Sequence, residues 1–219
     1  MGNIIHFLIT YLAKHPSILN TINFSKMDVM MCVQLLSLIF VLTTYSCAEY
    51  IIHKIHHPDT TEVNSFLITK DYLIAYTCGV VEYLIERYFW PSKSDPHSIM
   101  IYIGYALIAV GLYIRFAAII TAGKSFTHLV QLRKTKDHVL ITHGIYKYIR
   151  HPGYLGFLIF AVGTQIMLKN FFSVIGFYIV LWNFFNRRIA YEERGLIDMF
   201  GQEYRDYRDR TPTWIPFIK

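Results

Sequence analysis

The chain has 219 residues, of which 54% are hydrophobic and only 16% are charged. Soluble domains carry about 25% charged residues, so this composition excludes an ordinary soluble domain and predicts a multi-span membrane protein in a single domain. The net charge of +6 does not indicate nucleic acid, because a basic excess in a membrane protein usually reports topology and contact with anionic membrane lipid.

The first apolar segment, residues 3–24, is weak because Lys14, His15 and Pro16 interrupt it. It is expected to lie at the membrane interface or to form a short hairpin. Three longer segments each reach the roughly 20 apolar residues that a transmembrane helix needs. They are residues 27–50, 72–90 and 99–122.

Two further apolar segments, residues 154–168 and 171–185, are each about 15 residues long, which gives about 22 Å of helix against a hydrocarbon core of about 30 Å. Lys169 and Asn170 separate them. We interpret the pair as a helical hairpin that crosses most of the membrane and returns. Together with the longer segments, it predicts an all-α membrane bundle of about five spans.

The loop at residues 123–152 is strongly basic, with six Lys and Arg residues against the single acid Asp137. By the positive-inside rule this loop faces the cytoplasm. The hairpin returns to the same side, so the charged tail from residue 187 onward is cytoplasmic too. The single domain thus divides into an N-terminal segment (1–24), the spans (27–122) and a region expected to hold the cofactor and the catalytic groups (123–219).

Polar residues gather in the loop before the hairpin and in the tail after it. The loop ends in "RHPGYLGF" (residues 150–157), and the tail contains "RRIAYEERGLIDMFGQEYRDY" (residues 187–207). Taken alone, the stretch at residues 150–157 is ordinarily a loop with a helix stop. Taken alone, the pair Arg188 and Glu192 is ordinarily an ion pair on a helix surface. Because the hairpin folds the two stretches together, we expect a site between them.

Other stretches extend this pattern: "GTQ" (163–165), "TAGKSFTHLVQ" (121–131), "DHVLITHGIY" (137–146) and "DYLIAYTCGVVEYLIERYFWP" (71–91). Over residues 65–219 the sequence closely resembles the isoprenylcysteine carboxyl methyltransferases. The resemblance implies that a methyl group passes from S-adenosyl-L-methionine to the α-carboxylate of a protein's C-terminal cysteine carrying a farnesyl or geranylgeranyl group. It also implies the endoplasmic reticulum membrane, with the active site facing the cytoplasm.

The resemblance further implies which residues bind the donor. Glu192 is expected to bind the amino group of the donor. His151 and Tyr154, with the amides at the start of the hairpin helix, are expected to bind its carboxylate. The adenosine is expected to lie against the loop, at Gln131, His138, Val139, Leu140, Ile141 and Tyr146.

A C-terminal carboxylate is already ionised at neutral pH, so it needs no general base, and we expect no Ser-His-Asp set, metal site or catalytic thiol. It does need a cation, and the catalytic candidates are Arg188 and Arg115. An arginine in an apolar span costs about 2.5–3.5 kcal/mol on insertion scales; the alternative is that Arg115 snorkels to the interface. Glu82 and Glu86 are expected to pair with Arg87 or Arg115, to line the cavity or to be structural.

The isoprenoid is expected to enter from the bilayer, between the span that holds Arg115 and the hairpin. Gly156 and Gly163 lie seven residues apart, hence on one face of the first hairpin helix. There they either leave room for the isoprenoid or, equally, serve close helix packing. Three aromatic residues of the tail are expected to pack against the loop or to sit at headgroup level: Tyr204, Tyr207 and Trp214.

Three other functions fit the sequence less well. A methyltransferase acting on phospholipid amines would have to deprotonate its acceptor and would need no carboxylate-binding arginine. Sterol reductases share the RHP-type helix start but need a nicotinamide site, which the sequence does not offer. A non-enzymatic transporter or lipid-binding protein should have repeated halves and polar breaks at the membrane midplane, and the sequence has neither feature.

Overall fold

The computed structural model describes residues 29–56, 69–90, 97–126 and 139–218, and all regular elements in these ranges are helical. The prediction of an all-α fold is therefore confirmed for the described residues. The N-terminal segment 1–24 lies outside them. The elements are α3 (Val29–His56), α4 (Lys70–Phe89), α5 (Ile99–Ala122), η5 (Gly123–Ser125), η6 (Gly144–Lys147), α6 (Pro152–Leu168), α7 (Phe171–Phe200) and α8 (Gln202–Arg210).

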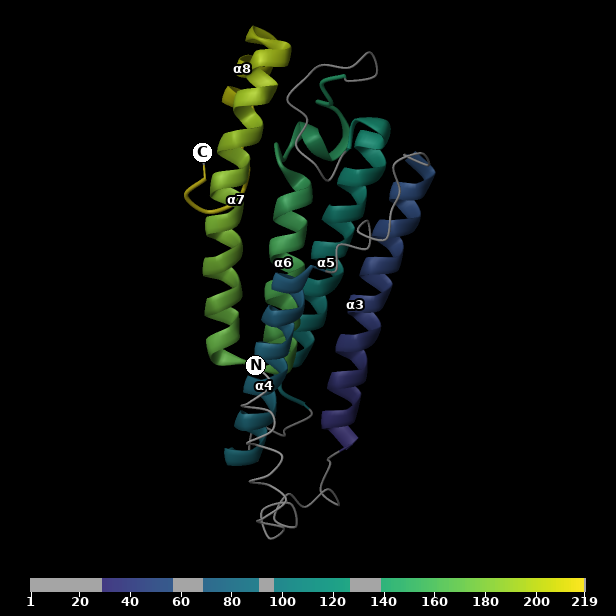
Figure 1. The fold of residues 1–219 in the computed structure, drawn as a ribbon, viewed down its shortest axis with the longest axis vertical. Coiled ribbons are helices and arrows are strands. Elements are labelled where there is room, and N and C mark those ends of the chain that lie inside the picture. The colour runs from purple at the N-terminus through teal and green to yellow at the C-terminus, as the bar shows by residue number, and fades with distance from the viewer. Residues whose placement is uncertain (1–28, 57–68, 91–96, 127–138, 219) are drawn as a thin grey trace.

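The long helices run along the long axis of the molecule (Figure 1). Helices α5 and α6 lie side by side at the centre, with α7 on one flank and α3 on the other. The short α8 and the C-terminal segment lie next to α7, toward one end of the bundle. An apolar core fills the space between the helices, and within it Tyr45 of α3 stacks on Phe160 of α6 with the ring centroids 4.9 Å apart.

Glycines allow α5 and α6 to pack with their backbones almost in contact. A Cβ atom built on Gly156 would lie 2.6 Å from the backbone nitrogen of Arg115, and one on Gly163 would lie 2.9 Å from Cβ of Leu107. This is the small-residue packing common between membrane helices. Gly156 and Gly163 therefore leave no room for an isoprenoid, and the expected entry path between α5 and α6 is wrong at these positions.

Buried amide side chains tie the outer helices to the central pair. The Gln34 side-chain amide of α3 donates to the Met167 carbonyl at 2.8 Å and accepts from the Tyr83 hydroxyl of α4 at 2.7 Å. The Asn170 amide donates to the Gly79 carbonyl of α4 at 2.8 Å. Since apolar contact alone gives membrane helices little reason to associate, such hydrogen bonds help to fix their arrangement.

A two-residue turn joins α6 to α7. Lys169 adopts a left-handed conformation with φ of 61°, and α7 begins directly after Asn170. The carboxylate of Glu82 on α4 accepts hydrogen bonds from the backbone N–H groups of Phe172 and Ser173, both at 2.7 Å. A negative side chain at a helix start satisfies otherwise unpaired donors and complements the helix dipole. Of the alternatives expected for Glu82, the structural role is therefore the one that holds: Glu82 caps α7.

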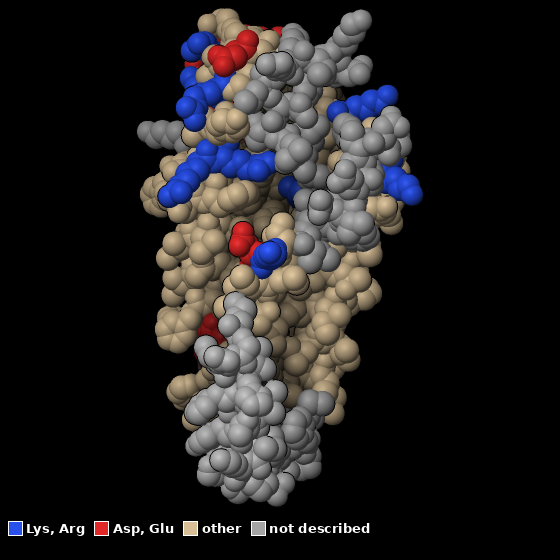
Figure 2. Space-filling view, viewed as in Figure 1, with Lys and Arg blue, Asp and Glu red and all other residues tan. Residues whose placement is uncertain are grey.

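Helix α7 continues well past residue 185, where its apolar segment was expected to end, because the charged stretch that follows keeps helical periodicity up to Phe200. Among the described residues, Val29–His56 and Ile99–Ser125 are long and apolar enough to cross a membrane by length and composition. Helices α4 and α7 do not meet this criterion because their charged side chains lower the mean hydropathy, and α6 does not because it is short. On the face in Figure 2, Lys and Arg gather toward the α8 end, above a mostly uncharged surface.

Candidate functional site

A cavity of about 400 Å³ opens where α5, α6 and α7 meet the segment that follows residue 138. Its volume lies within the range of small-molecule sites. Nine of the eleven residues expected at the site line this cavity: Arg115, Val139, Leu140, Ile141, Tyr146, His151, Tyr154, Arg188 and Glu192. The other two, Gln131 and His138, lie outside the described residues.

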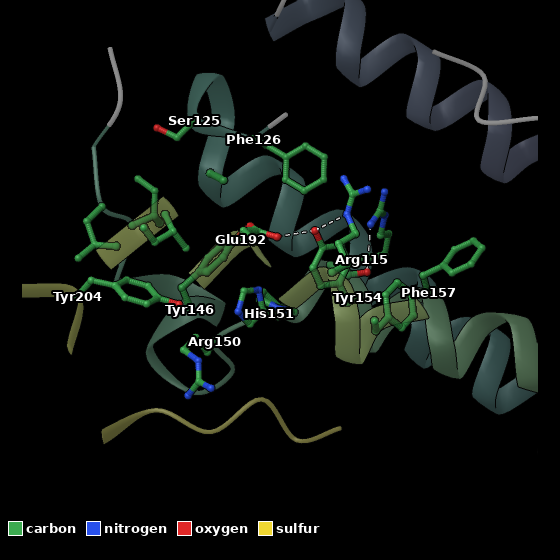
Figure 3. A pocket seen from close by; sticks show the side chains of 18 of the residues that line it. Arg115, Ser125, Phe126, Tyr146, Arg150, His151, Tyr154, Phe157, Glu192 and Tyr204 are labelled. Carbon is green, nitrogen blue, oxygen red and sulfur yellow. Dashed lines mark hydrogen bonds between the residues drawn. The ribbon is translucent and has the colours of Figure 1, made fainter. Parts of the chain in front are cut away.

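A tyrosine hydroxyl links the two charged residues that α7 presents to the cavity. The Tyr154 hydroxyl on α6 donates to Glu192 at 2.5 Å and accepts from Arg188 Nε at 2.9 Å. Arg188 and Glu192 are one helical turn apart, so both can face α6. Figure 3 shows Glu192 and Tyr154 pointing toward each other across the cavity. The sequence indicated all three residues but not the bridge between them.

Glu193, the neighbour of Glu192, turns to the other side and holds the "RHP" segment. It accepts a hydrogen bond from Arg150 Nε at 2.6 Å, and His151 Nε2 lies 3.0 Å from the same oxygen. The two adjacent glutamates thus have different partners. One ring nitrogen of His151 is committed to Glu193, although His151 still lines the cavity and its ring stacks on that of Tyr154.

The charges around Glu193 change its acidity. Burial by itself would raise the pKa of this carboxyl group, but the hydrogen bond and charge of His151, followed by the charge of Arg150, outweigh burial and lower the pKa from its ordinary value of 4.5. Hydrogen bonds and opposite charges both favour the ionised form. Glu193 is therefore ionised at neutral pH and can hold both basic side chains.

Arg150 fastens the tail to the loop before α6. Its Nη1 donates to the carbonyls of Arg208 at 3.0 Å and Thr211 at 2.6 Å, and its backbone N–H donates to the Pro212 carbonyl at 2.9 Å. The hydroxyl of Tyr207 on α8 donates to the Tyr146 carbonyl at 2.7 Å. The tail thereby closes one side of the cavity, and Tyr207, together with the buried Tyr204, packs inward.

Arg115 is buried and paired. Its Nε and Nη2 donate to the two carboxylate oxygens of Glu49 at 2.6 and 3.2 Å, and its Nη1 donates to the Gly153 carbonyl at 3.1 Å. Arg115 therefore does not snorkel to the interface; it joins α3 to the first turn of α6. Glu49 was missed, although an acid near the end of an apolar segment was a visible signal. Because Glu49 offsets its charge, Arg115 is a weaker candidate than Arg188 for binding an anion.

The start of α6 offers a further polar feature. The helix begins with Pro152, whose fixed φ suits the first turn, and the side chain of its N-cap residue, His151, makes no capping hydrogen bond. Helix starts present N–H groups and a positive dipole end to an anion. This end points into the same cavity as Glu192, since Pro152 and Gly153 both line it. The cavity therefore combines a carboxylate, a guanidinium and a helix start within a partly aromatic wall.

Comparisons with known proteins agree on one family. The family model described as isoprenylcysteine carboxyl methyltransferase (ICMT) family matches residues 103–198. The chain is 41% identical over 186 residues to protein-S-isoprenylcysteine O-methyltransferase B of Arabidopsis thaliana, covering 84% of this chain and 94% of that protein. It is 35% identical over 180 residues to the Homo sapiens protein-S-isoprenylcysteine O-methyltransferase, covering 81% of this chain and 63% of the human protein. A solved structure of the eukaryotic intramembrane Ras methyltransferase ICMT superposes with a TM-score of 0.78 at 39% identity, covering 81% of this chain and 64% of that chain.

Proposed function

This chain belongs to the isoprenylcysteine carboxyl methyltransferase family, and on that premise we propose that it methylates the α-carboxylate of a C-terminal prenylated cysteine. The observation that carries the proposal is the bridge Arg188–Tyr154–Glu192 in one cavity. It offers a cation to an acceptor carboxylate and an anion to the ammonium group of an amino-acid-like methyl donor. A phospholipid amine as acceptor would have no use for the cation.

The donor that suits this cavity is S-adenosyl-L-methionine, which supplies an electrophilic methyl group when bound. The residues present fit it. Glu192 would hold its ammonium group, and the start of α6, where the side chain of His151 makes no capping hydrogen bond, would hold its carboxylate. Val139, Leu140 and Ile141 offer apolar side chains beside the cavity for the adenosine. The first two assignments follow from the charge of each group, and the third follows from the apolar character of residues 139–141.

The acceptor requires positioning rather than proton transfer. Its carboxylate is ionised at neutral pH, so no residue has to act as a general base. Arg188 would orient this carboxylate, and the closed tail would keep water away from the reacting groups. Holding two reactants in line and excluding water can account for much of a rate enhancement. The farnesyl or geranylgeranyl chain would have to reach the cavity by a route other than the α5–α6 contact.

The side of the membrane that the site faces follows from how the protein is oriented in a bilayer. The chain is an integral membrane protein, as its apolar helices and the intramembrane enzyme that it resembles indicate. We place the basic loop and the tail in the cytoplasm, since Lys and Arg concentrate there. The membrane of the endoplasmic reticulum is the compartment that the family resemblance implies. A water-soluble donor would then enter from the cytoplasm and a lipid-anchored acceptor from the bilayer.

The acceptor can be identified with purified protein and S-adenosyl-L-methionine that carries a labelled methyl group. We expect labelling of N-acetyl-S-farnesylcysteine or its geranylgeranyl analogue, and no labelling of phosphatidylethanolamine. The product should release volatile label in alkali, because a methyl ester hydrolyses to methanol whereas an N-methyl group stays attached. Methylation of the phospholipid alone would overturn the proposed acceptor.

A further inference from the structure

The segment after α8 presents aromatic side chains outward although it is itself well anchored. Ile215 and Ile218 are buried against α6 and α7, whereas the residues before each of them, Trp214 and Phe217, are 66% and 92% exposed. Both aromatic residues have left-handed backbones, with φ of 59° and 64°. Such a conformation is unfavourable for bulky residues. The fold thus leaves two large aromatic side chains exposed at a conformational cost.

Two indole hydrogen bonds fix the position of this segment. The indole N–H of Trp182 on α7 donates to the Pro216 carbonyl at 2.7 Å, and that of Trp214 donates to the Tyr148 carbonyl at 3.0 Å. The backbone around Phe217 is therefore tied to α7, and Trp214 is tied to the segment before α6. The exposed rings are part of a defined surface, not of a loose chain end.

This surface lies at the boundary between the apolar and the charged part of α7. Trp182, which holds the Pro216 carbonyl, comes five residues before Arg187, about 7.5 Å toward the apolar side at 1.5 Å per residue. After the charged α8, the chain thus returns to the level at which α7 becomes apolar. In Figure 1 the yellow C-terminal segment runs back along α7 from its α8 end.

A cation completes the surface. Tyr148 is 65% exposed, and the exposed Lys147 ammonium group lies 5.8 Å from the centre of its ring. We call Lys147, Tyr148, Trp214 and Phe217 the aromatic patch. Amphipathic rings beside lysine are typical of the headgroup level of a bilayer, where Trp and Tyr are enriched and lysine meets anionic lipid.

We propose that the aromatic patch inserts into the headgroup region of the surrounding bilayer and anchors the tail to the membrane. Phe217 reaches toward the acyl chains, Trp214 and Tyr148 lie among the headgroups, and Lys147 meets anionic lipid. Since Arg150 and Tyr207 connect the tail to the cavity wall, the anchor holds the closing segment at the membrane surface. This inference depends on the protein's lying in a membrane and not on the identity of its substrates.

Tryptophan fluorescence in lipid nanodiscs of phosphatidylcholine, with and without phosphatidylserine, tests the proposal. The emission of wild-type protein minus that of Trp214→Phe reports on Trp214. Phosphatidylcholine brominated close to the headgroup should remove most of this emission, lipid brominated near the chain end should remove less, and aqueous iodide should have little effect. Quenching by iodide but not by brominated lipid would overturn the proposal, since the indole would then lie in water.

Phe217→Ala provides an independent test, because a side chain that is 92% exposed can be removed with little effect on folding. Loss of this anchor should reduce the quenching of total emission by brominated lipid. Tyr191→Ala removes an exposed ring from the charged half of α7 and should leave quenching unchanged. If instead Phe217→Ala keeps full lipid quenching but raises KM for a prenylated protein and not for a prenylated cysteine, the patch binds the acceptor protein and the membrane proposal is wrong.

Discussion

Individual residues of the cavity have separable tasks because adjacent side chains turn to different partners. Glu192 meets the Tyr154 hydroxyl inside the cavity, while Glu193 holds Arg150 and His151. The two glutamates are adjacent in the sequence motif, so their order alone could not show that they have different partners. It depends on where α6 and the tail lie around α7.

Glu192→Gln should weaken binding of the methyl donor and leave the fold intact. The substitution removes the negative charge that we propose binds the donor's ammonium group but keeps an acceptor for the Tyr154 hydroxyl. Loss of a charge-assisted hydrogen bond costs about 1.5–3 kcal/mol, which corresponds to a Kd raised roughly tenfold or more. Calorimetric titration with S-adenosyl-L-methionine measures this, and an unchanged Kd would remove Glu192 from the donor site.

Glu49→Gln should lower the stability of the whole bundle. Arg115 would keep its charge in a buried place but lose the carboxylate that pairs with it. Removing one partner of a buried ion pair costs about 3–5 kcal/mol. Thermal unfolding in detergent checks this, with Glu203→Gln, on the exposed face of α8, as the matched control. Equal melting temperatures for both variants would show that Arg115 finds another partner.

At the scale of elements, the α5–α6 contact is the centre of the bundle. The sequence predicted the two helices but not how closely they pack. Hydropathy and length predicted α4, α5 and α6 closely, because apolar runs bounded by polar residues define them, whereas α3 continues to His56, past the predicted end at residue 50. Spacing alone could not separate a tunnel from packing at Gly156 and Gly163. Which of the two is right depends on the atoms that face the glycines, and most of these atoms belong to the backbone of α5. Likewise, the partner of Arg115 could not be chosen among several acids before the orientation of α3 was known.

Gly156→Leu should therefore lower the melting temperature and impair both substrates together. The new side chain would meet the backbone of Arg115 and Gly111, which cannot move aside as a flexible side chain can. Overpacking a close contact costs about 1–3 kcal/mol or more, and the displacement would carry Arg115 and Gly153 with it. Thermal unfolding and steady-state kinetics measure the two effects.

Gly176→Ala is the matched control, since a methyl group added to this glycine of α7 would meet no atom of the described residues within 4 Å. In a helix interior, alanine is more favourable than glycine by up to about 1 kcal/mol, so this variant should be neutral or slightly more stable. A Gly156→Leu protein with wild-type stability and a raised KM for the prenylated acceptor alone would instead support an isoprenoid tunnel at Gly156.

On the scale of the whole molecule, the loop before α6, the end of α7 and the segment from α8 onward form one cap over the cavity, and Arg150 connects them. Arg150 reaches Glu193 on α7 and the carbonyls of Arg208 and Thr211 in the tail. The sequence predicted that loop and tail come together, because a hairpin returns its two ends to one side. It could not predict that Arg150 is the connecting residue.

Acid should weaken this cap through Glu193. The pKa of this carboxyl group is lower in the folded protein than its ordinary value of 4.5. Its contribution to stability is therefore fully present above pH 4.5 and is lost as the pH falls through the lower, folded-state pKa. We expect Glu193→Gln to be less stable than wild type at neutral pH and the difference to shrink below pH 4.5, as measured by thermal unfolding. A difference that does not depend on pH would show that the charge of Glu193 is unimportant.

The hydroxyl of Tyr154 touches both Glu192 and Arg188, so on the assignments proposed above the two substrates should depend on each other. An ammonium group that binds Glu192 competes with the Tyr154 O–H for the carboxylate. A carboxylate that binds Arg188 competes with the Tyr154 oxygen for the guanidinium. Binding of either ligand weakens the Arg188–Tyr154–Glu192 bridge, so the second ligand has less hydrogen-bond energy to displace and should bind more tightly. Thermodynamic linkage requires this cooperativity to be equal in both directions, whichever ligand arrives first.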